Sequence, residues 1–169
     1  MTDLIGDIHG HSNKLEELLI NMGYKKRKGV YSHPGRKVLF VGDYIDRGPK
    51  IRETLELVRS MVESDNAIAL MGNHEYNALC FHFQETEGGH LRKHLIKNII
   101  QHYDTLKQFQ NRQQEYEDYL FWFKSLPKID SNETDKKLWQ SVLIEMLRTT
   151  KKLKVQKVGQ ANVTKQNIH

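Results

Sequence analysis

Three short apolar runs, each followed by a glycine and a polar residue, divide the first half of the chain. Short apolar runs bounded by turn residues are typical of buried strands. We therefore predict three strands, at residues 2–5, 38–41 and 67–71. The pairs that end them are Gly6-Asp7, Gly42-Asp43 and Gly72-Asn73.

Between these runs, apolar residues recur at helical spacing. One helical stripe begins after Ser12 and Asn13, either of which can cap its helix. A second stripe, at residues 51–62, follows Pro49, a residue favoured at the first position of a helix. A third helix is expected to begin near His74. Alternating strands and helices are typical of a parallel sheet with crossover helices, in which ligands bind at the carboxyl ends of the strands.

The rest of the chain predicts mainly helices, so the predicted fold class is α/β, with a βαβαβ half and a mainly helical second part. Residues 91–123 and 138–147 form helical stripes, and residues 151–169 are expected to be frayed. We divide the chain into a domain at 1–130 and a helix with a basic tail at 131–169. The first stripe places five apolar residues on one face: Leu95, Ile99, Tyr103, Leu106 and Phe109.

Composition and charge argue against several classes of protein. No stretch of the 169 residues approaches the roughly 20 apolar residues of a membrane span, and no signal peptide is evident. Cys80 is the only cysteine, which suits a reducing compartment, so we predict a cytoplasmic protein without a membrane partner. The net charge of +5 lies wholly within residues 131–169. A basic tail without interleaved aromatic residues is usually solvated, so nucleic-acid binding is not expected.

Residue types that bind metals follow each predicted strand. Asp7 and His9 lie two apart on an extended segment, so both side chains can point the same way and bind a divalent transition metal. Asp43 follows the second strand, and its two oxygens can bridge two metal ions. After the third strand, Asn73 offers a carbonyl oxygen, and His74 can protonate a leaving group near neutral pH.

Asp46 and Arg47 lie a few residues beyond Asp43. The guanidinium group of Arg47 is a planar set of donors that fits a phosphate group. Taken singly, the loops have plainer interpretations: a hydrogen-bonded turn, an Asp46–Arg47 ion pair that caps the next helix, and an Asn73 helix cap. Because three successive strands end in such loops, a shared metal and phosphate site is the preferred hypothesis.

Three blocks of this sequence resemble the signatures of the phosphoprotein phosphatases, within the calcineurin-like metallophosphoesterases. They are GDIHG at 6–10, GDYIDRG at 42–48 and GNHE at 72–75, and their order and spacing also match. The resemblance extends from residue 1 to about 127. It is strongest to bacterial members, which include protein phosphatases and diadenosine-tetraphosphate hydrolases. It implies the N-terminal βαβαβ half of an αββα sandwich.

The resemblance also implies roles for individual residues. His74 would be the general acid, oriented and kept charged by Asp46, while Arg47 would bind the phosphoryl oxygens. Two divalent ions are implied, manganese above all, or iron or zinc, with a bridging hydroxide that attacks phosphorus in line. The implied metal ligands are Asp7 and His9 for the first ion, Asp43 between the ions and Asn73 for the second.

The sequence departs from the family pattern after the third block. Family members supply further histidine ligands there, whereas residues 131–166 contain no histidine. We therefore expect a chain truncated after the third motif, with a weak second metal site and strands for only one of two sheets. His90 and His94 are four residues apart and could share a helical face. A solvent-exposed face is a better interpretation of this pair than a metal site.

Three functions remain open. The first is a metal-dependent phosphoesterase similar to a serine/threonine protein phosphatase, acting on a phosphorylated protein or a small phosphoester. The second is a symmetrical dinucleoside-tetraphosphate hydrolase that uses the same site. The third is a catalytically impaired, truncated family member that acts only as a binding module.

Overall fold

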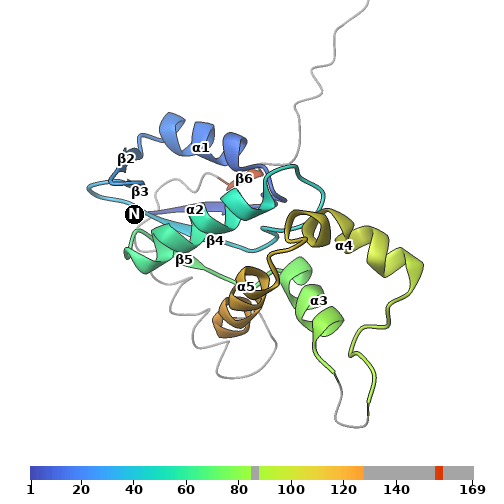
Figure 1. Ribbon diagram of the computed structural model, residues 1–169. Coiled ribbons are helices and arrows are strands. Elements are labelled where there is room, and N and C mark those ends of the chain that lie inside the picture. Colours follow the sequence, from blue (N-terminus) through green and yellow to red (C-terminus); the bar gives the residue numbers. More distant parts are fainter. Residues whose placement is uncertain (85–87, 128–154, 158–169) are drawn as a thin grey trace, which may run out of the picture.

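A parallel four-stranded sheet forms the centre of the computed structural model, which describes residues 1–84, 88–127 and 155–157 (Figure 1). The strand order is β5-β4-β1-β6, and each neighbouring pair is parallel. The three predicted strands and the predicted α/β fold class are confirmed. The strands are β1 (Thr2–Gly6), β4 (Lys37–Phe40), β5 (Ala67–Ala69) and β6 (Val155–Lys157).

Strand β6 lies within the segment that the sequence predicts to be frayed. It pairs with β1, with Leu4 opposite Val155 and Gly6 opposite Lys157. The strand has three residues, too few for an alternating pattern to show, and its partner lies about 150 residues away in the chain. The expectation of a frayed segment is therefore wrong for these three residues, because the strand forms only through pairing with a distant segment.

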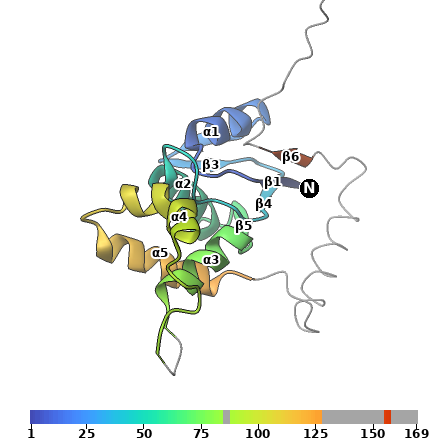
Figure 2. The ribbon, with the colours of Figure 1, turned by 90° about the vertical axis from the view of Figure 1, so that its right-hand side faces the viewer.

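Helices α1 (Ser12–Asn21) and α2 (Ile51–Glu63) cover one face of the sheet (Figure 2). Their buried residues join those of the strands in the main core. The predicted side-chain cap of α1 is wrong, because His11 is the cap residue and makes no side-chain cap bond, while Ser12 is buried inside the helix. Pro49 lies two residues before α2, whose cap residue is Lys50. Strands β2 (Lys25–Arg27) and β3 (Val30–Ser32) form a separate antiparallel hairpin.

The second part of the described chain contains α3 (Asn73–His82), α4 (Ile96–Gln108) and α5 (Gln113–Ser125). The predicted stripe on α4 is partly wrong, because Leu95, Ile99 and Tyr103 are exposed, although Phe109 is buried. The buried residues of α4 are instead His102 and Thr105. These polar side chains face a buried carboxylate of another loop, and this tertiary contact sets the orientation of the helix.

Some predictions fall on residues outside the described ranges. The predicted helix at 138–147 lies there, as does most of the basic tail, so the division of the chain at residue 130 stays a prediction. Within residues 1–84, 88–127 and 155–157, no helix has both the length and the apolar character needed to span a membrane.

Candidate functional site

The loops that follow β1 and β4 are joined by backbone hydrogen bonds at one edge of the sheet. The N–H of His9 donates to the carbonyl of Asp43 (2.8 Å), and the N–H of Gly10 donates to that of Tyr44 (2.8 Å). A Cβ atom at position 48 would overlap the carbonyl oxygen of His9, so only glycine permits this approach. The predicted convergence of the loops follows from the neighbouring, parallel strands.

Five polar residues of these two loops have positive φ angles. They are Asp7 (53°), His9 (45°), Asp43 (60°), Asp46 (66°) and Arg47 (66°). Such angles are uncommon for residues other than glycine and persist where surrounding contacts hold the backbone. The strained positions coincide with the predicted site residues, as is common at binding and catalytic sites.

Glu75 joins the second loop to the start of α3. Its carboxylate accepts backbone hydrogen bonds from Asp43 (2.9 Å), Tyr44 (2.8 Å), Ile45 (3.3 Å) and Gly72 (3.0 Å). Burial raises the pKa of Glu75 to about 7, although the backbone N–H groups favour the charged form and oppose that rise. The side chain is fully buried, so its carboxylate holds the loop after β4 against the start of α3 from inside the protein. We call this contact the Glu75 clamp.

The predicted site residues do not include Glu75. A local signal was available, since a glutamate three residues after a helix cap commonly accepts a bond from the cap N–H. Glu75 makes that bond to Gly72. Its three bonds to the second loop have no local signal, because that loop is about 30 residues away in the chain.

His9 is held in one tautomer. Its Nδ1 lies 2.9 Å from the carbonyl oxygen of Ile45, which only accepts, so Nδ1 carries the proton. The unprotonated Nε2 accepts a hydrogen bond from Arg47 at 3.3 Å. An imidazole whose Nδ1–H is bonded to a carbonyl offers its unprotonated Nε2 to a metal ion.

His74 and Asp46 form a buried pair. Nδ1 of His74 lies 2.6 Å from Oδ2 of Asp46, and Nε2 accepts a hydrogen bond from Arg47 at 3.3 Å. Burial acts to lower the pKa of His74, but the hydrogen bond and charge of Asp46 raise it above the ordinary value. Nδ1 is therefore occupied, and Nε2 is the ring atom directed towards the site.

Asp46 accepts three side-chain hydrogen bonds. Besides His74, the donors are His102 (2.8 Å) and Thr105 (2.6 Å), both to Oδ1. Burial opposes ionisation, but the bonds from His102, His74 and Thr105 lower the pKa of Asp46 below its usual range. The alternative of an Asp46–Arg47 ion pair that caps α2 is wrong, because the Asp46 carboxylate is directed towards these three residues.

A potential metal-binding group lies beside Arg47. One donor atom from each of His9, Asp43 and His74 lies within 4.8 Å of the others. Imidazole nitrogen and carboxylate oxygen suit a divalent transition metal, so the donor set fits the predicted ion. Asp7 lies in the same loop as His9 but outside this group of three.

Asn73 lies beside the same group. Its side-chain amide is 2.9 Å and 3.1 Å from the two oxygens of Asp43 when the amide nitrogen faces them. The alternative of an Asn73 helix cap is wrong, since Gly72 is the cap residue of α3 and Asn73 is the first residue of the helix. The structure thus brings Asn73, Asp43, His74, His9 and Arg47 together.

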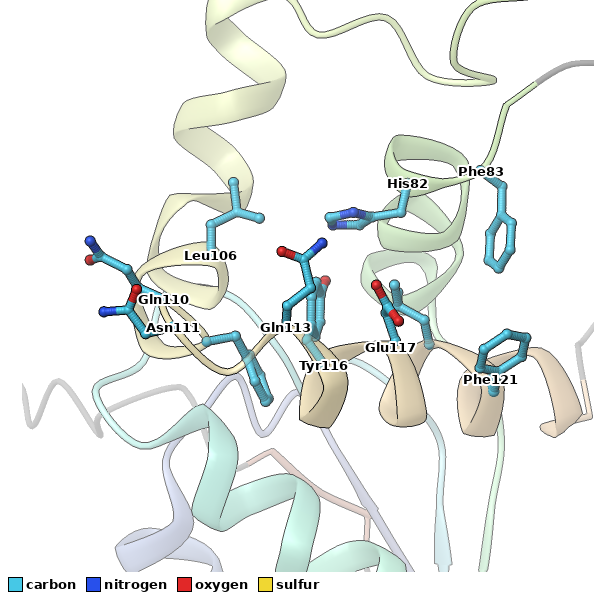
Figure 3. Close-up of a pocket in the computed structure, with 11 residues that line it drawn as sticks. His82, Phe83, Leu106, Gln110, Asn111, Gln113, Tyr116, Glu117 and Phe121 are labelled. Atoms are coloured by element: carbon cyan, nitrogen blue, oxygen red, sulfur yellow. The ribbon is translucent and has the colours of Figure 1, made fainter.

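A cavity of about 550 Å³ lies between α3, α4 and α5 (Figure 3). His82 and Tyr116 form part of its wall. Nε2 of His82 is buried and has no hydrogen-bond partner in the described part of the chain. Burial and the neighbouring histidines lower the pKa of His82 to about 4.

His90 and His94 precede α4, so the predicted shared helical face is wrong. Their rings stack on each other with centroids 4.0 Å apart, and His94 also stacks on Phe81 at 4.0 Å. Nε2 of His94 bonds to the carbonyl oxygen of Phe81 (2.7 Å). Among the described residues, the potential metal-binding groups of three or more contain neither histidine.

We expect acid to destabilise the protein through His82. Its folded pKa of about 4 lies below the ordinary 6.5, so the unfolded chain binds the proton first. Stability is then lost as the pH falls from 6.5 towards 4. Between pH 7 and pH 5, the wild type should lose about 1–2 kcal/mol more than His82→Gln in urea denaturation. Equal losses in the two proteins would contradict this assignment.

The chain matches the calcineurin-like phosphoesterase family over residues 2–157. It therefore belongs to that family, and the predicted family membership is confirmed. A solved metallophosphoesterase from Sphaerobacter thermophilus is 25% identical, with a TM-score of 0.46, and the match covers 75% of this chain and 40% of that one.

Two curated relatives are asymmetrical bis(5'-nucleosyl)-tetraphosphatases named PrpE. The relative from Halalkalibacterium halodurans is 47% identical over 73 residues, which are 43% of this chain and 30% of the relative. The relative from Oceanobacillus iheyensis is 39% identical over 111 residues, which are 64% of this chain and 43% of the relative. The chain thus spans less than half the length of either relative.

Proposed function

We propose that this chain is a metal-dependent phosphoester hydrolase whose substrate class is the dinucleoside tetraphosphates. The observation that supports the reaction type best is the grouping of Arg47, His74 and His9, in which one guanidinium contacts both Nε2 atoms at 3.3 Å. The names of the curated relatives favour this substrate class. The proposal includes a cytoplasmic location, on the basis of the single cysteine. It includes neither a membrane partner nor a nucleic-acid partner.

The metal ions would be held by Asp7, His9, Asp43 and Asn73. Manganese, iron and zinc all suit these nitrogen and oxygen donors. Bound ions would supply positive charge that favours attack of water on phosphorus. The second ion would bind weakly, because Asp43 and Asn73 alone are a poor ligand set.

Arg47 and His74 would act on the substrate itself. The exposed guanidinium group of Arg47 can bind two phosphoryl oxygens and offset the charge that develops on them. His74, protonated on Nε2, can donate that proton to the departing oxygen. Asp46 holds the Nδ1–H of His74 at 2.6 Å, so the ring keeps Nε2 directed towards the leaving group.

Arg47 has to leave Nε2 of His74 for this chemistry to occur. The guanidinium is a donor, and a protonated Nε2 is also a donor, so the two cannot remain hydrogen-bonded. We infer that a bound phosphate attracts Arg47 away from the imidazoles.

A test of the proposal is metal-dependent turnover and its loss in Asp43→Asn. Chelator-treated protein should be inactive towards p-nitrophenyl phosphate, and manganese should restore turnover. The amide keeps one oxygen ligand but loses the charge, so manganese affinity measured by calorimetry should fall at least about 10-fold. Asp118→Asn, which alters an exposed carboxylate on α5, is the matched control.

Different outcomes separate the alternatives. Release of AMP and ATP from diadenosine tetraphosphate would support asymmetrical cleavage, and two ADP molecules would support symmetrical cleavage. Turnover of a phosphopeptide alone would favour a protein phosphatase. Manganese binding without turnover of any substrate would indicate the binding module, and no binding at all would overturn the proposed metal site.

A further inference from the structure

Helix α4 supplies two side chains that hold Asp46 from the side opposite His74. His102 and Thr105 lie three residues apart on the buried face of α4 and both donate to Oδ1 of Asp46. The hydroxyl oxygen of Thr105 also accepts a hydrogen bond from the backbone N–H of Asp46 at 3.1 Å. Asp46 has a φ angle of 66°, so these contacts hold a backbone conformation that is unfavourable for this residue.

Tyr116 of α5 holds His102 in turn. Its hydroxyl lies 2.7 Å from Nε2 of His102. The tyrosine ring stacks on Phe109 (centroids 4.6 Å apart) and meets His82 edge-on (5.0 Å). Figure 3 shows Tyr116 between Gln113 and Glu117 on the side of α5 that faces His82. The ring is therefore fixed on both sides, which sets the position of its hydroxyl.

The chemistry of the groups sets the direction of each hydrogen bond. The Asp46 carboxylate only accepts, so Nδ1 of His102 carries a proton. When the His102 ring is neutral, Nε2 is then an acceptor and the Tyr116 hydroxyl donates to it. The result is a one-way series of donors, from Tyr116 through His102 to Asp46, with the His74 Nδ1–H bound at the other oxygen of the carboxylate.

We propose that His102 is a positioning residue for His74, an inference that rests on the proposed function. His102 and Thr105 occupy Oδ1 of Asp46, which leaves Oδ2 to His74. The carboxylate cannot rotate without breaking these bonds, and every member of the series is buried. Loss of the Tyr116 hydroxyl leaves Nε2 of His102 without its buried partner, so the ring is held only through Asp46, which would loosen the carboxylate and weaken the hold on His74.

The test compares Tyr116→Phe with Tyr24→Phe. Each substitution removes one buried hydroxyl that bonds to a side chain, but Tyr24 bonds to Asp3, which has no contact with the site. Nitrogen-15 NMR of the histidine rings should show His74 with a proton on Nδ1 in the wild type and in Tyr24→Phe. In Tyr116→Phe the His74 signals should shift or broaden.

Turnover gives a second measurement on the same proteins. With manganese and an alkyl phosphate, Tyr116→Phe should lower kcat about 3–10-fold with KM unchanged. The loss should be smaller with p-nitrophenyl phosphate, whose leaving group needs little protonation. His102→Phe should produce the same pattern with a larger loss, and Tyr24→Phe should leave both values unchanged.

The outcomes separate the positioning role from the proposed function. Folded Tyr116→Phe with unchanged His74 signals and unchanged kcat would overturn the positioning role. If the wild type lacks turnover but the His74 signals still change in Tyr116→Phe and not in Tyr24→Phe, the positioning role is supported while the proposed function fails. Equal losses in Tyr116→Phe and Tyr24→Phe would indicate a general effect on stability and would also overturn the positioning role.

Discussion

Glu75→Gln should destabilise the folded protein by about 2–4 kcal/mol, because buried donors are left without acceptors. The carboxylate accepts four backbone N–H bonds from the second loop and the start of α3. An amide has one accepting oxygen, and its NH₂ group would face two of these donors. Urea denaturation at pH 8.5, above the raised pKa of about 7, measures the wild type with Glu75 charged.

A matched control for this substitution is Glu63→Gln at the end of α2. Glu63 is exposed and pairs only with Arg59 in the described structure, so its loss should cost less than about 1 kcal/mol. A loss as small as this in Glu75→Gln would show that Glu75 is protonated and tolerates an amide. A loss of about 2–4 kcal/mol would instead show that the buried charge of Glu75 fixes the loop after β4 relative to the start of α3.

His74→Asn should lower turnover of an alkyl phosphate by about 100-fold to 10,000-fold, the range that general acid catalysis supplies. Asparagine can still donate to Asp46 at the position of Nδ1 but has no proton to give at the position of Nε2. With p-nitrophenyl phosphate the loss should be much smaller, because that leaving group departs without protonation. Steady-state kinetics on both substrates, with manganese present, measures the difference.

The leaving-group dependence separates an acid from a metal ligand. His74 also lies within the group formed with His9 and Asp43, so its loss could act through metal binding. In that case both substrates would lose activity equally, and manganese affinity would fall with them. Equal losses would therefore contradict the acid role, and Asp118→Asn again serves as the control because it leaves the site intact.

The positions of most of the proposed site residues could be predicted from local sequence. Asp7, Asp43 and Asn73 each follow a glycine at the end of an apolar run, and the order of those runs predicts adjacent parallel strands. Neighbouring strands then bring the three loops to one edge, as observed. The strands and the convergence of the loops could be predicted because strand and turn lie within a few residues of one another in the chain, while the roles of these residues as ligands stay a prediction.

The supporting residues could not be predicted in this way. His102 and Thr105 bond to a carboxylate 56 and 59 residues earlier in the chain, and Tyr116 bonds to His102 across the gap between two helices. The apolar stripe of α4 favours a neighbouring face of the helix, since its members Leu95, Ile99 and Tyr103 are exposed while Phe109 is buried beside Thr105. The helix turns its polar residues inward because a buried carboxylate without donors would cost more free energy than leaving Leu95 and Ile99 exposed.

The order of residues along the chain was therefore enough to establish the family and the parallel sheet and to indicate the proposed site residues, because each depends on residues that are close in sequence. The folded chain alone established the Glu75 clamp, the support of Asp46 by α4 and the pairing of β6 with β1. These features join segments separated by some 30 to 150 residues. Their energies depend on burial and on hydrogen-bond geometry, which exist only after the segments have packed together.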